Sequence, residues 1–203
     1  MTNPNWILRT ARMVLTPVGG VDLADLQTIK ADPRVFAIML GGVRTSEQST
    51  AELAEDVITW GSVGFGTWAI RETSAPFPAV VQPARGSRLC GNDEWGPTGT
   101  FAGIAGLEAR PDGRGVALRF ALWPEAQGRG LAREAAGAVL RFGHERAGLR
   151  RIVAVARESN VGSRTVLGGI GMTECASFLQ QGWPMVMYES IAIQPPPPAG
   201  ALR

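Results

Sequence analysis

The stretch from Leu122 to Val139, LWPEAQGRGLAREAAGAV, decides the fold of this chain. An apolar run, Val116 to Trp123, leads into a glycine-rich turn at 127–132. Beyond the turn, apolar side chains recur three and four residues apart, which predicts one buried face of a helix. These side chains are Leu131, Ala135, Ala138, Val139 and Phe142. The stretch therefore predicts a strand, a tight turn and a helix in immediate succession.

This succession is typical of a cradle for a phosphate group. Glycine lets the backbone approach an anion closely, and the first amides of a helix have no acceptor within the helix. Arg129 adds a positive charge at the mouth of the turn. We therefore expect the stretch to hold a phosphorylated cofactor.

The composition is that of an ordinary globular protein. The chain has 203 residues and a mass of 21.5 kDa, and 45% of its residues are hydrophobic. Its net charge of +2 is too small for nucleic-acid binding driven by overall charge. We expect a single domain over residues 1–193 and a disordered proline-rich tail over residues 194–203.

Cysteine and histidine are too scarce for the usual metal frameworks. The chain has two cysteines, Cys90 and Cys175, without a CxxC pair, and His144 is its single histidine. We therefore expect no metal site and no disulfide framework. We also find no signal peptide and no apolar run of transmembrane length, so we expect a cytoplasmic protein without a membrane partner.

The N-terminal part of the chain predicts one strand followed by helices. Residues 1–8 are expected to form a loose arm. The predicted elements are a strand over 9–18, two short helices over 22–39 that Pro33 separates, and a capped helix from Thr45 to about Trp60. On the last of these helices, Leu53, Val57 and Trp60 are predicted to share the buried face.

The rest of the chain predicts mostly strands. The predicted elements are strands over 66–72, 100–109, 116–123 and 150–156, a weak helix over 160–170, and two strands within 173–193. A strand–helix–strand unit implies a right-handed crossover, so the strands 116–123 and 151–156 are expected to pair in parallel. The segment 73–100 matches no element and is long enough to be functional or disordered.

Two motifs make the chain resemble the GNAT superfamily of acyl-CoA N-acyltransferases. The family's cofactor motif is a Gln or Arg, two residues, a Gly, one residue, and a Gly or Ala. It is matched here by Gln127-Gly128-Arg129-Gly130-Leu131-Ala132. A second family signature appears as Asn160-Val161-Gly162-Ser163, followed by Gly171-Met172. The resemblance covers residues 8–192 and looks strongest to the branch of Rim-type ribosomal-protein N-terminal acetyltransferases.

Other glycine-rich cradles fit this turn less well. A Walker A loop requires a lysine, which the turn lacks. A dinucleotide fingerprint requires a third glycine at a fixed offset and an acidic residue ending the next strand, where this chain has Arg157. A kinase-type loop requires a catalytic-loop signature that the sequence does not contain.

The resemblance implies an α/β (α+β) fold. In this family a mixed, mostly antiparallel sheet of six to seven strands is flanked by about four helices. Two parallel strands at its centre, here 116–123 and 151–156, splay apart, and the first of them carries a bulge. The pantetheine arm of the cofactor lies in the resulting cleft like an additional strand.

The implied co-substrate is acetyl-CoA. The resemblance places its pyrophosphate on the backbone amides of residues 128–132, with charge from Arg129 and Arg133, and its pantetheine on the main chain of residues 122–123. An amide of this strand end is expected to polarise the thioester carbonyl. The full expected cofactor-binding set is Leu122, Trp123, Gln127, Gly128, Arg129, Gly130, Leu131, Ala132, Asn160 and Ser163.

The implied reaction is direct attack of an acceptor amine on the thioester, without a covalent enzyme intermediate. A base must take the proton of the amine. Glu108 is the first candidate, and Glu94 is a weaker one. Many members of the branch carry an acidic residue on the cradle strand, where this chain has Arg119-Phe120, so a base on that strand is in doubt.

The leaving thiolate needs a proton or a hydrogen bond. Ser163, which matches the family motif, and Tyr188, the single tyrosine, are the candidates. Glu134 is expected to have a structural role, as a helix cap or an arginine partner.

The acceptor is expected to be a primary amine on a protein N-terminus, a polyamine or a small molecule such as an amine antibiotic. Trp95 lies beside Asp93 and Glu94, a combination that suits an amine-bearing ligand or a loop folded on itself. Two alternatives stay open. One is a non-catalytic CoA-binding sensor or interaction protein of the same fold, and the other is an interaction module whose proline tail binds the partner. A homodimer is compatible with each.

Overall fold

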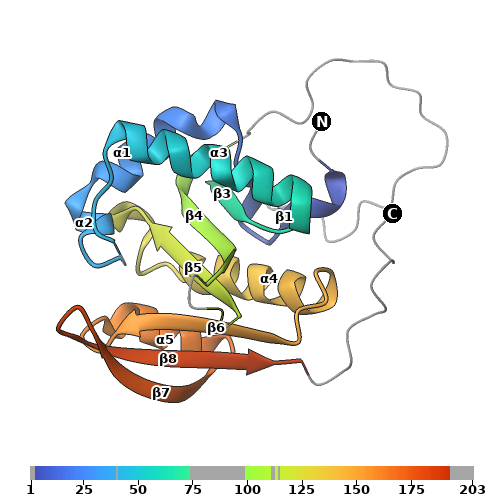
Figure 1. Cartoon of the computed structure of the whole chain (residues 1–203). Helices are drawn as coiled ribbons and strands as arrows, with labels where there is room; N and C mark the ends of the chain where they lie inside the picture. The colour runs from blue at the N-terminus through green and yellow to red at the C-terminus, as the bar shows by residue number, and fades with distance from the viewer. Residues whose placement is uncertain (1–2, 40, 74–98, 111–112, 114, 193–203) are drawn as a thin grey trace, which may run out of the picture.

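The computed structural model describes residues 3–39, 41–73, 99–110, 113 and 115–192. They form one eight-stranded sheet with the strand order β1-β2-β3-β4-β5-β6-β8-β7 (Figure 1). The strands are β1 (Leu8–Arg9), β2 (Met13–Pro17), β3 (Thr67–Glu72), β4 (Thr100–Ala109), β5 (Val116–Leu122), β6 (Arg151–Arg157), β7 (Thr173–Gln180) and β8 (Trp183–Ile191). Every neighbouring pair is antiparallel except β5 with β6. The predicted mixed, mostly antiparallel fold is confirmed.

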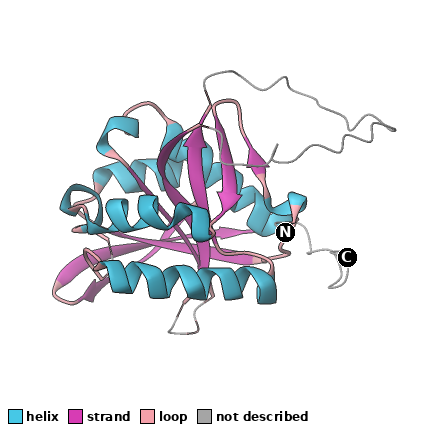
Figure 2. Ribbon diagram, turned by 90° about the horizontal axis from the view of Figure 1, so that it is seen from above, coloured by secondary structure: helices cyan, strands magenta, loops and turns pink. Residues whose placement is uncertain are grey.

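Helices cover both faces of this sheet (Figure 2). They are α1 (Leu23–Ala31), α2 (Pro33–Phe36), α3 (Ser46–Val63), α4 (Leu131–Glu145) and α5 (Val161–Gly169), with short 3-10 turns η1 (Pro4–Trp6), η2 (Gly20–Asp22) and η3 (Pro124–Ala126). One buried cluster joins α1, α2 and α3 to Ala69 and Ile104 of the sheet. The other joins α4 and α5 to residues that include Leu107 and Ile152. The site described below lies at the end of β5, where residues of both helical layers line the same cavity.

Helix α4 packs against the sheet as its spacing predicts. All the apolar side chains of the expected stripe are at most 7% exposed; they are Leu131, Ala135, Ala138, Val139 and Phe142. Gly143 brings the helix close to the sheet, because a Cβ there would come within 2.5 Å of Cδ1 of Ile152. The C-terminal end of α4 therefore packs directly against the sheet.

Helix α3 begins as predicted but buries a different face. Thr45 and Gln48 form a reciprocal capping box, and Gly64 ends the helix with a φ of 76°. Val57, which the sequence predicts to be buried, is 50% exposed. The face toward the sheet instead runs through Ser49, Leu53, Asp56 and Trp60, with Asp56 half-buried. An acidic side chain thus takes the position in the stripe that the spacing assigned to valine.

The structure corrects the predicted number and bounds of several elements. Within the described residues the sheet has eight strands instead of six or seven. The predicted strand over 9–18 is divided into β1, which takes Leu8 from the expected loose arm, and β2, with which β1 pairs. The described residues form five α-helices, against the about four that the resemblance implies, and the predicted division at Pro33 into two short helices is confirmed by α1 and α2. The sequence predicts that the last two strands flank Gly182-Trp183-Pro184, but the turn consists of Gln181 and Gly182, and Trp183 and Pro184 belong to β8.

The parallel strands β5 and β6 pair over a short length and then separate. The only paired residues are Val116 with Ile152 and Ala117 with Val153, so the predicted splay is confirmed. The expected bulge on β5 is wrong, because the β4–β5 register shows no shift. The shift lies between β3 and β4, where Gly103 has a φ of 153° and a Cβ would lie 2.2 Å from the carbonyl oxygen of Ala121.

Some sequence predictions fall outside the described residues. Cys90, Asp93, Glu94 and Trp95 lie there, together with the proline-rich tail over residues 194–203. Within the described residues, no helix has both the length and the apolar character that crossing a membrane requires.

Candidate active site

Three cavities open next to one another around the splayed strands, and Met39 and Phe120 line all of them. The first, of about 610 Å³, follows the glycine turn and the starts of α4 and α5, and we call it the cradle cavity. The second, of about 370 Å³, lies between β5 and β6 and is the central cavity. The third, of about 390 Å³, lies under α3 and is the α3 cavity. Together they form a path between the two helical layers.

The glycine turn presents a row of unused amides to the cradle cavity. Gly128 and Gly130 have φ values of 70° and 78°, a backbone conformation that favours glycine. From Gly128 to Arg133, no main-chain amide has an acceptor in the described part of the chain, and the first bonded amide is that of Glu134. Amides in this arrangement fit an anion at the start of α4. The predicted cradle is therefore present in its geometry.

Ion pairs hold the turn in place from outside. The guanidinium of Arg129 makes two bonds to Glu72, at 2.9 and 2.6 Å. Arg12 donates to the carbonyl oxygen of Arg129 at 2.8 Å and pairs with Glu134 at 2.6 Å. The guanidinium charge of Arg129 is thus already engaged by a carboxylate, which corrects the expectation that it serves an anion at the mouth. The amide of Arg129 faces no such competitor.

Glu134 has the structural role that its sequence position predicts. Partial burial opposes its ionisation, but hydrogen bonds from Thr10 and Arg12 outweigh that effect and hold the pKa of Glu134 below its ordinary value. Arg133, which was expected to add charge together with Arg129, is exposed and lines the cradle cavity.

The end of β5 offers fewer free groups than expected. The Trp123 amide donates to the carbonyl oxygen of Ala102 at 3.0 Å, and the Leu122 carbonyl accepts from the side chain of Gln127 at 3.0 Å. Main-chain groups of successive residues in a strand face opposite neighbours. The amides of Phe120 and Leu122 therefore face the side from which β6 has separated. These amides, and not that of Trp123, are available to a ligand in the cleft.

Asn160 and Ser163 lie together at the start of α5, where they line both the cradle and the central cavities. The Asn160 side chain accepts from the Ser163 amide at 3.0 Å and caps the helix. Within the described residues, the Ser163 hydroxyl has no hydrogen-bond partner. A hydroxyl at this place can donate to a ligand in either cavity.

Tyr188 lies away from this path. It is 6% exposed in β8, opposite Ala154, and its hydroxyl accepts from Nε of Arg164 at 3.2 Å. It lines none of the three cavities. The prediction that Tyr188 supplies a proton to a leaving group therefore finds no geometric support, because its strand turns the ring into the core beneath α5.

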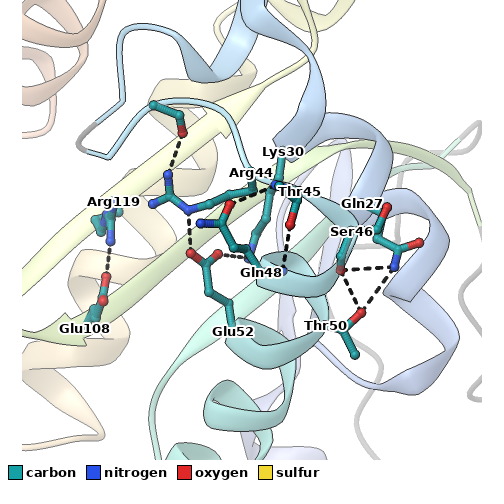
Figure 3. A network of polar contacts seen from close by, with 11 residues as sticks. Gln27, Lys30, Arg44, Thr45, Ser46, Gln48, Thr50, Glu52, Glu108 and Arg119 are labelled. Carbon is teal, nitrogen blue, oxygen red and sulfur yellow. Dashed lines mark hydrogen bonds and ion pairs between the residues drawn. The ribbon is translucent and has the colours of Figure 1, made fainter.

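Glu108 lies at the boundary between the central and the α3 cavities and lines both. Its carboxylate forms an ion pair with Arg119 of the neighbouring strand (Figure 3). More than half of the Glu108 side chain is exposed, at 57%. Arg119 thus stands beside the candidate base on the neighbouring strand.

A second polar group occupies the wall of the α3 cavity. Glu52 binds both Lys30 of α1, at 2.7 Å, and Arg44, at 2.5 Å (Figure 3). Burial opposes the ionisation of Glu52, but the hydrogen bonds from these cations hold its pKa below the ordinary value. Asp56, one turn further along α3, behaves in the opposite way: burial raises the pKa of its carboxyl. The same helix thus carries one carboxylate in two ion pairs, Glu52, and one without an ion pair among the described residues, Asp56.

Sequence reasoning missed the residues that support the turn and those that form the α3 cavity. Arg12 and Glu72 are separated from the glycine turn by many residues, and no local pattern announces their contact. Asp56 had a signal, because it lies three residues after Leu53 and four before Trp60, inside the apolar stripe. A charged residue at that spacing is unusual for a purely structural helix face.

Comparison with known proteins agrees with this geometry. The family model described as an acetyltransferase (GNAT) domain matches residues 12–173. The FsC-acetyl coenzyme A-N(2)-transacetylase of Aspergillus fumigatus is 26% identical over 188 residues, which cover 86% of this chain and 68% of that protein.

Two solved structures share the fold at low sequence identity. An acetyltransferase from Salmonella typhimurium that modifies the N-terminal serine of ribosomal protein L7/L12 has a TM-score of 0.68 and 14% identity, over 92% of this chain and 99% of that one. Spermidine N-acetyltransferase from Vibrio cholerae, in complex with CoA and spermine, has a TM-score of 0.65 and 13% identity, over 90% and 96% of the chains.

Proposed function

The chain belongs to the GNAT acetyltransferase family, and we propose that it transfers the acetyl group of acetyl-CoA to a primary amine. The observation that carries the proposal is the row of unused amides from Gly128 to Arg133, which continues into the separated edge of β5. The first group suits a pyrophosphate and the second suits an extended arm that ends in a thioester. The residues present therefore fit this co-substrate.

Bound acetyl-CoA supplies an activated acyl group, and the protein contributes position and fixed dipoles. An amide of Phe120 or Leu122 would point at the thioester carbonyl and stabilise the charge that develops on its oxygen. No side chain needs to form a covalent bond, because holding an amine against the thioester already converts a bimolecular step into a local one.

Proton transfer is assigned to Glu108 and Ser163. Glu108 lines both the cavity between the strands and the α3 cavity, so it can accept the proton of an incoming amine directly or through a water molecule. Its pairing with Arg119 holds the carboxylate at the boundary of the two cavities. Ser163, whose hydroxyl has no partner among the described residues, would donate a hydrogen bond to the leaving sulfur.

The proposal is tested with purified full-length protein in two steps. Calorimetry measures acetyl-CoA binding, and release of free CoA thiol is then followed with N-terminal peptides, polyamines and small amines as acceptors. We expect one acetyl-CoA per chain and amine-dependent thiol release. Absence of acetyl-CoA binding would contradict the proposal at its first step.

Acetyl-CoA binding without turnover would support the alternative function. If acetyl-CoA binds but no amine in a broad panel releases CoA, the protein is a CoA-binding sensor or interaction protein of this fold. The exposed Glu108 and its pairing with Arg119 are the features that would then have to be explained as structural.

A further inference from the structure

The α3 cavity contains a carboxylate that has no cationic partner in the described part of the protein. Asp56 is half-buried on α3 and lines this cavity. The cations along the same cavity bind other carboxylates, in the pairs Lys30–Glu52, Arg44–Glu52 and Arg119–Glu108 (Figure 3). These three cations thus bind two carboxylates, and none of them forms an ion pair with the half-buried Asp56.

This arrangement is unfavourable as long as the cavity holds only water. Burial raises the pKa of Asp56, and the nearby charge of Glu108 adds to the effect. Hydrogen bonds from the side chain and the backbone of Thr67 and the charge of Lys30 partly oppose it. A half-buried carboxylate without a counter-ion costs free energy that an ammonium ion would recover. The cavity therefore favours a cationic ligand group at Asp56.

The position of Asp56 indicates which amine of an acceptor would bind to it. Glu108 and Arg119 line both the central and the α3 cavities, whereas Asp56 lines only the α3 cavity. An amine can attack the thioester only after it has lost its extra proton, which Glu108 is placed to accept at the boundary of the two cavities. A cation held at Asp56 is therefore a different part of the acceptor from the amine that reacts.

We propose that Asp56 binds a second, non-reacting ammonium group of the acceptor, so that the enzyme selects acceptors with two cationic groups. The proposal rests on the proposed acetyl transfer and adds no covalent step to it. The ammonium donates hydrogen bonds to the Asp56 carboxylate, and the other amine of the same molecule extends past Glu108 toward the cleft. A cavity of about 390 Å³ has the size of an ordinary small-molecule site.

The test compares diamines with monoamines of the same carbon chain. Diaminopropane, diaminobutane and diaminopentane are assayed against propyl-, butyl- and pentylamine at saturating acetyl-CoA. The proteins are the wild type, Asp56→Asn and the control Glu145→Gln. Glu145 is an exposed residue of α4 that lines none of the cavities described above. Its substitution removes one negative charge, as Asp56→Asn does, but away from the cavities.

We expect the wild type to prefer the best diamine over its monoamine by about 10- to 100-fold in kcat/KM, the range for one hydrogen bond between charged groups. In Asp56→Asn the preference should disappear through a higher KM for the diamine, with the values for the monoamine unchanged. Glu145→Gln should keep the wild-type preference. Where no amine in the series is acetylated, calorimetric titration of the same amines into the CoA-loaded proteins gives the same comparison.

Three results would overturn the proposal. The first is a wild type that does not distinguish diamines from monoamines in turnover or in binding. The second is an Asp56→Asn variant that keeps the preference for diamines. The third is an Asp56→Asn variant whose kcat falls equally for both kinds of amine, which would indicate a role in proton transfer. Failure of the proposed acetyl transfer is recognised separately, because it appears as lost acetyl-CoA binding in the wild type before any amine is added.

Discussion

The cradle cavity and the α3 cavity lie side by side but are built in different ways. The cradle cavity presents main-chain amides from one continuous stretch, Gly128 to Arg133, and its side-chain ion pairs lie outside the ligand path. The α3 cavity presents side chains from α1, α3, β4, β5 and the Arg44 segment, with its cations in ion pairs and Asp56 outside them. One recognises a ligand with its backbone and the other with its side chains.

This difference separates what is shared from what is particular to this chain. Backbone amides bind any phosphate, provided that the turn keeps its φ angles, so the cradle suits a co-substrate common to a whole family. Side-chain charges can be exchanged one by one without disturbing the sheet. The identity of the acceptor is therefore expected to depend on the α3 cavity, and substitutions in the two cavities should change different kinetic constants.

The largest expected effect belongs to Glu108, at the boundary of the cavities. Glu108→Gln should lower kcat by about 100-fold or more, the usual contribution of a general base, because the amide cannot take a proton. The affinity for acetyl-CoA, measured by calorimetry, should stay the same. The isosteric control Glu145→Gln should keep full activity. A kcat within about twofold of the wild type would exclude Glu108 as the base.

A smaller loss is expected when the backbone of the cradle is changed. Gly130 has a φ of 78°, and an alanine there is strained by about 1–2 kcal/mol, so the turn should relax and its amides should lose their common direction. Gly130→Ala should weaken acetyl-CoA binding about tenfold, because that strain corresponds to this change in Kd.

Gly182 provides the matched control for this substitution. It also has a φ of 78° and lies in the β7–β8 turn, where a Cβ meets no atom within 4 Å. Gly182→Ala should show similar strain in thermal unfolding but unchanged acetyl-CoA affinity. Equal losses of affinity in both variants would mean that strain alone, and not the position of the cradle amides, explains the effect.

Removing the two hydroxyls considered as donors to the leaving thiolate should change kcat by modestly different amounts. Ser163→Ala should lower kcat about fivefold, the worth of one ordinary hydrogen bond, because its hydroxyl faces the cavities. Tyr188→Phe should leave kcat unchanged, since that hydroxyl is bonded to Arg164 away from the cavities. The reverse order of effects in steady-state assays would restore Tyr188 as the acid and remove Ser163.

The smallest effect concerns stability. Because the pKa of Asp56 is raised in the folded protein, its ionised form destabilises the fold at neutral pH. This cost is relieved as the pH falls through the raised pKa toward the ordinary value of 3.8, below which it is absent. Asp56→Asn should therefore unfold at a slightly higher temperature than the wild type near pH 7, with the difference shrinking on acidification. A lower unfolding temperature at pH 7 would instead identify Asp56 as a structural residue.

The fold and the cradle were accessible from the sequence because their signals are local. The motif at 127–132, the apolar stripe of α4 and the Asn160–Ser163 cap each occupy a few consecutive residues, and local spacing determines them. The confirmed splay of β5 from β6 follows from the family resemblance. The bulge was misplaced because it depends on the pairing of β3 with β4 and on Gly103, which no motif includes.

The acceptor side was not accessible, because its contacts join distant parts of the chain. Lys30, Arg44 and Glu52 meet only after α1 and α3 have packed together. The engagement of Arg129 by Glu72 likewise depends on the position of β3. Asp56 is the exception. Its spacing from Leu53 and Trp60 places it on the buried face of α3, but the preference for apolar side chains there selects Val57 instead.

Amide proton–nitrogen correlation spectra of the labelled protein, recorded during titration with CoA and then with inorganic pyrophosphate, examine the cradle itself. With either ligand, the account predicts that the amide resonances of Gly128 to Arg133 shift downfield, because their protons acquire an acceptor. Only CoA should also shift those of Phe120 and Leu122. Unchanged resonances at 128–133 in a protein that binds CoA would contradict the account.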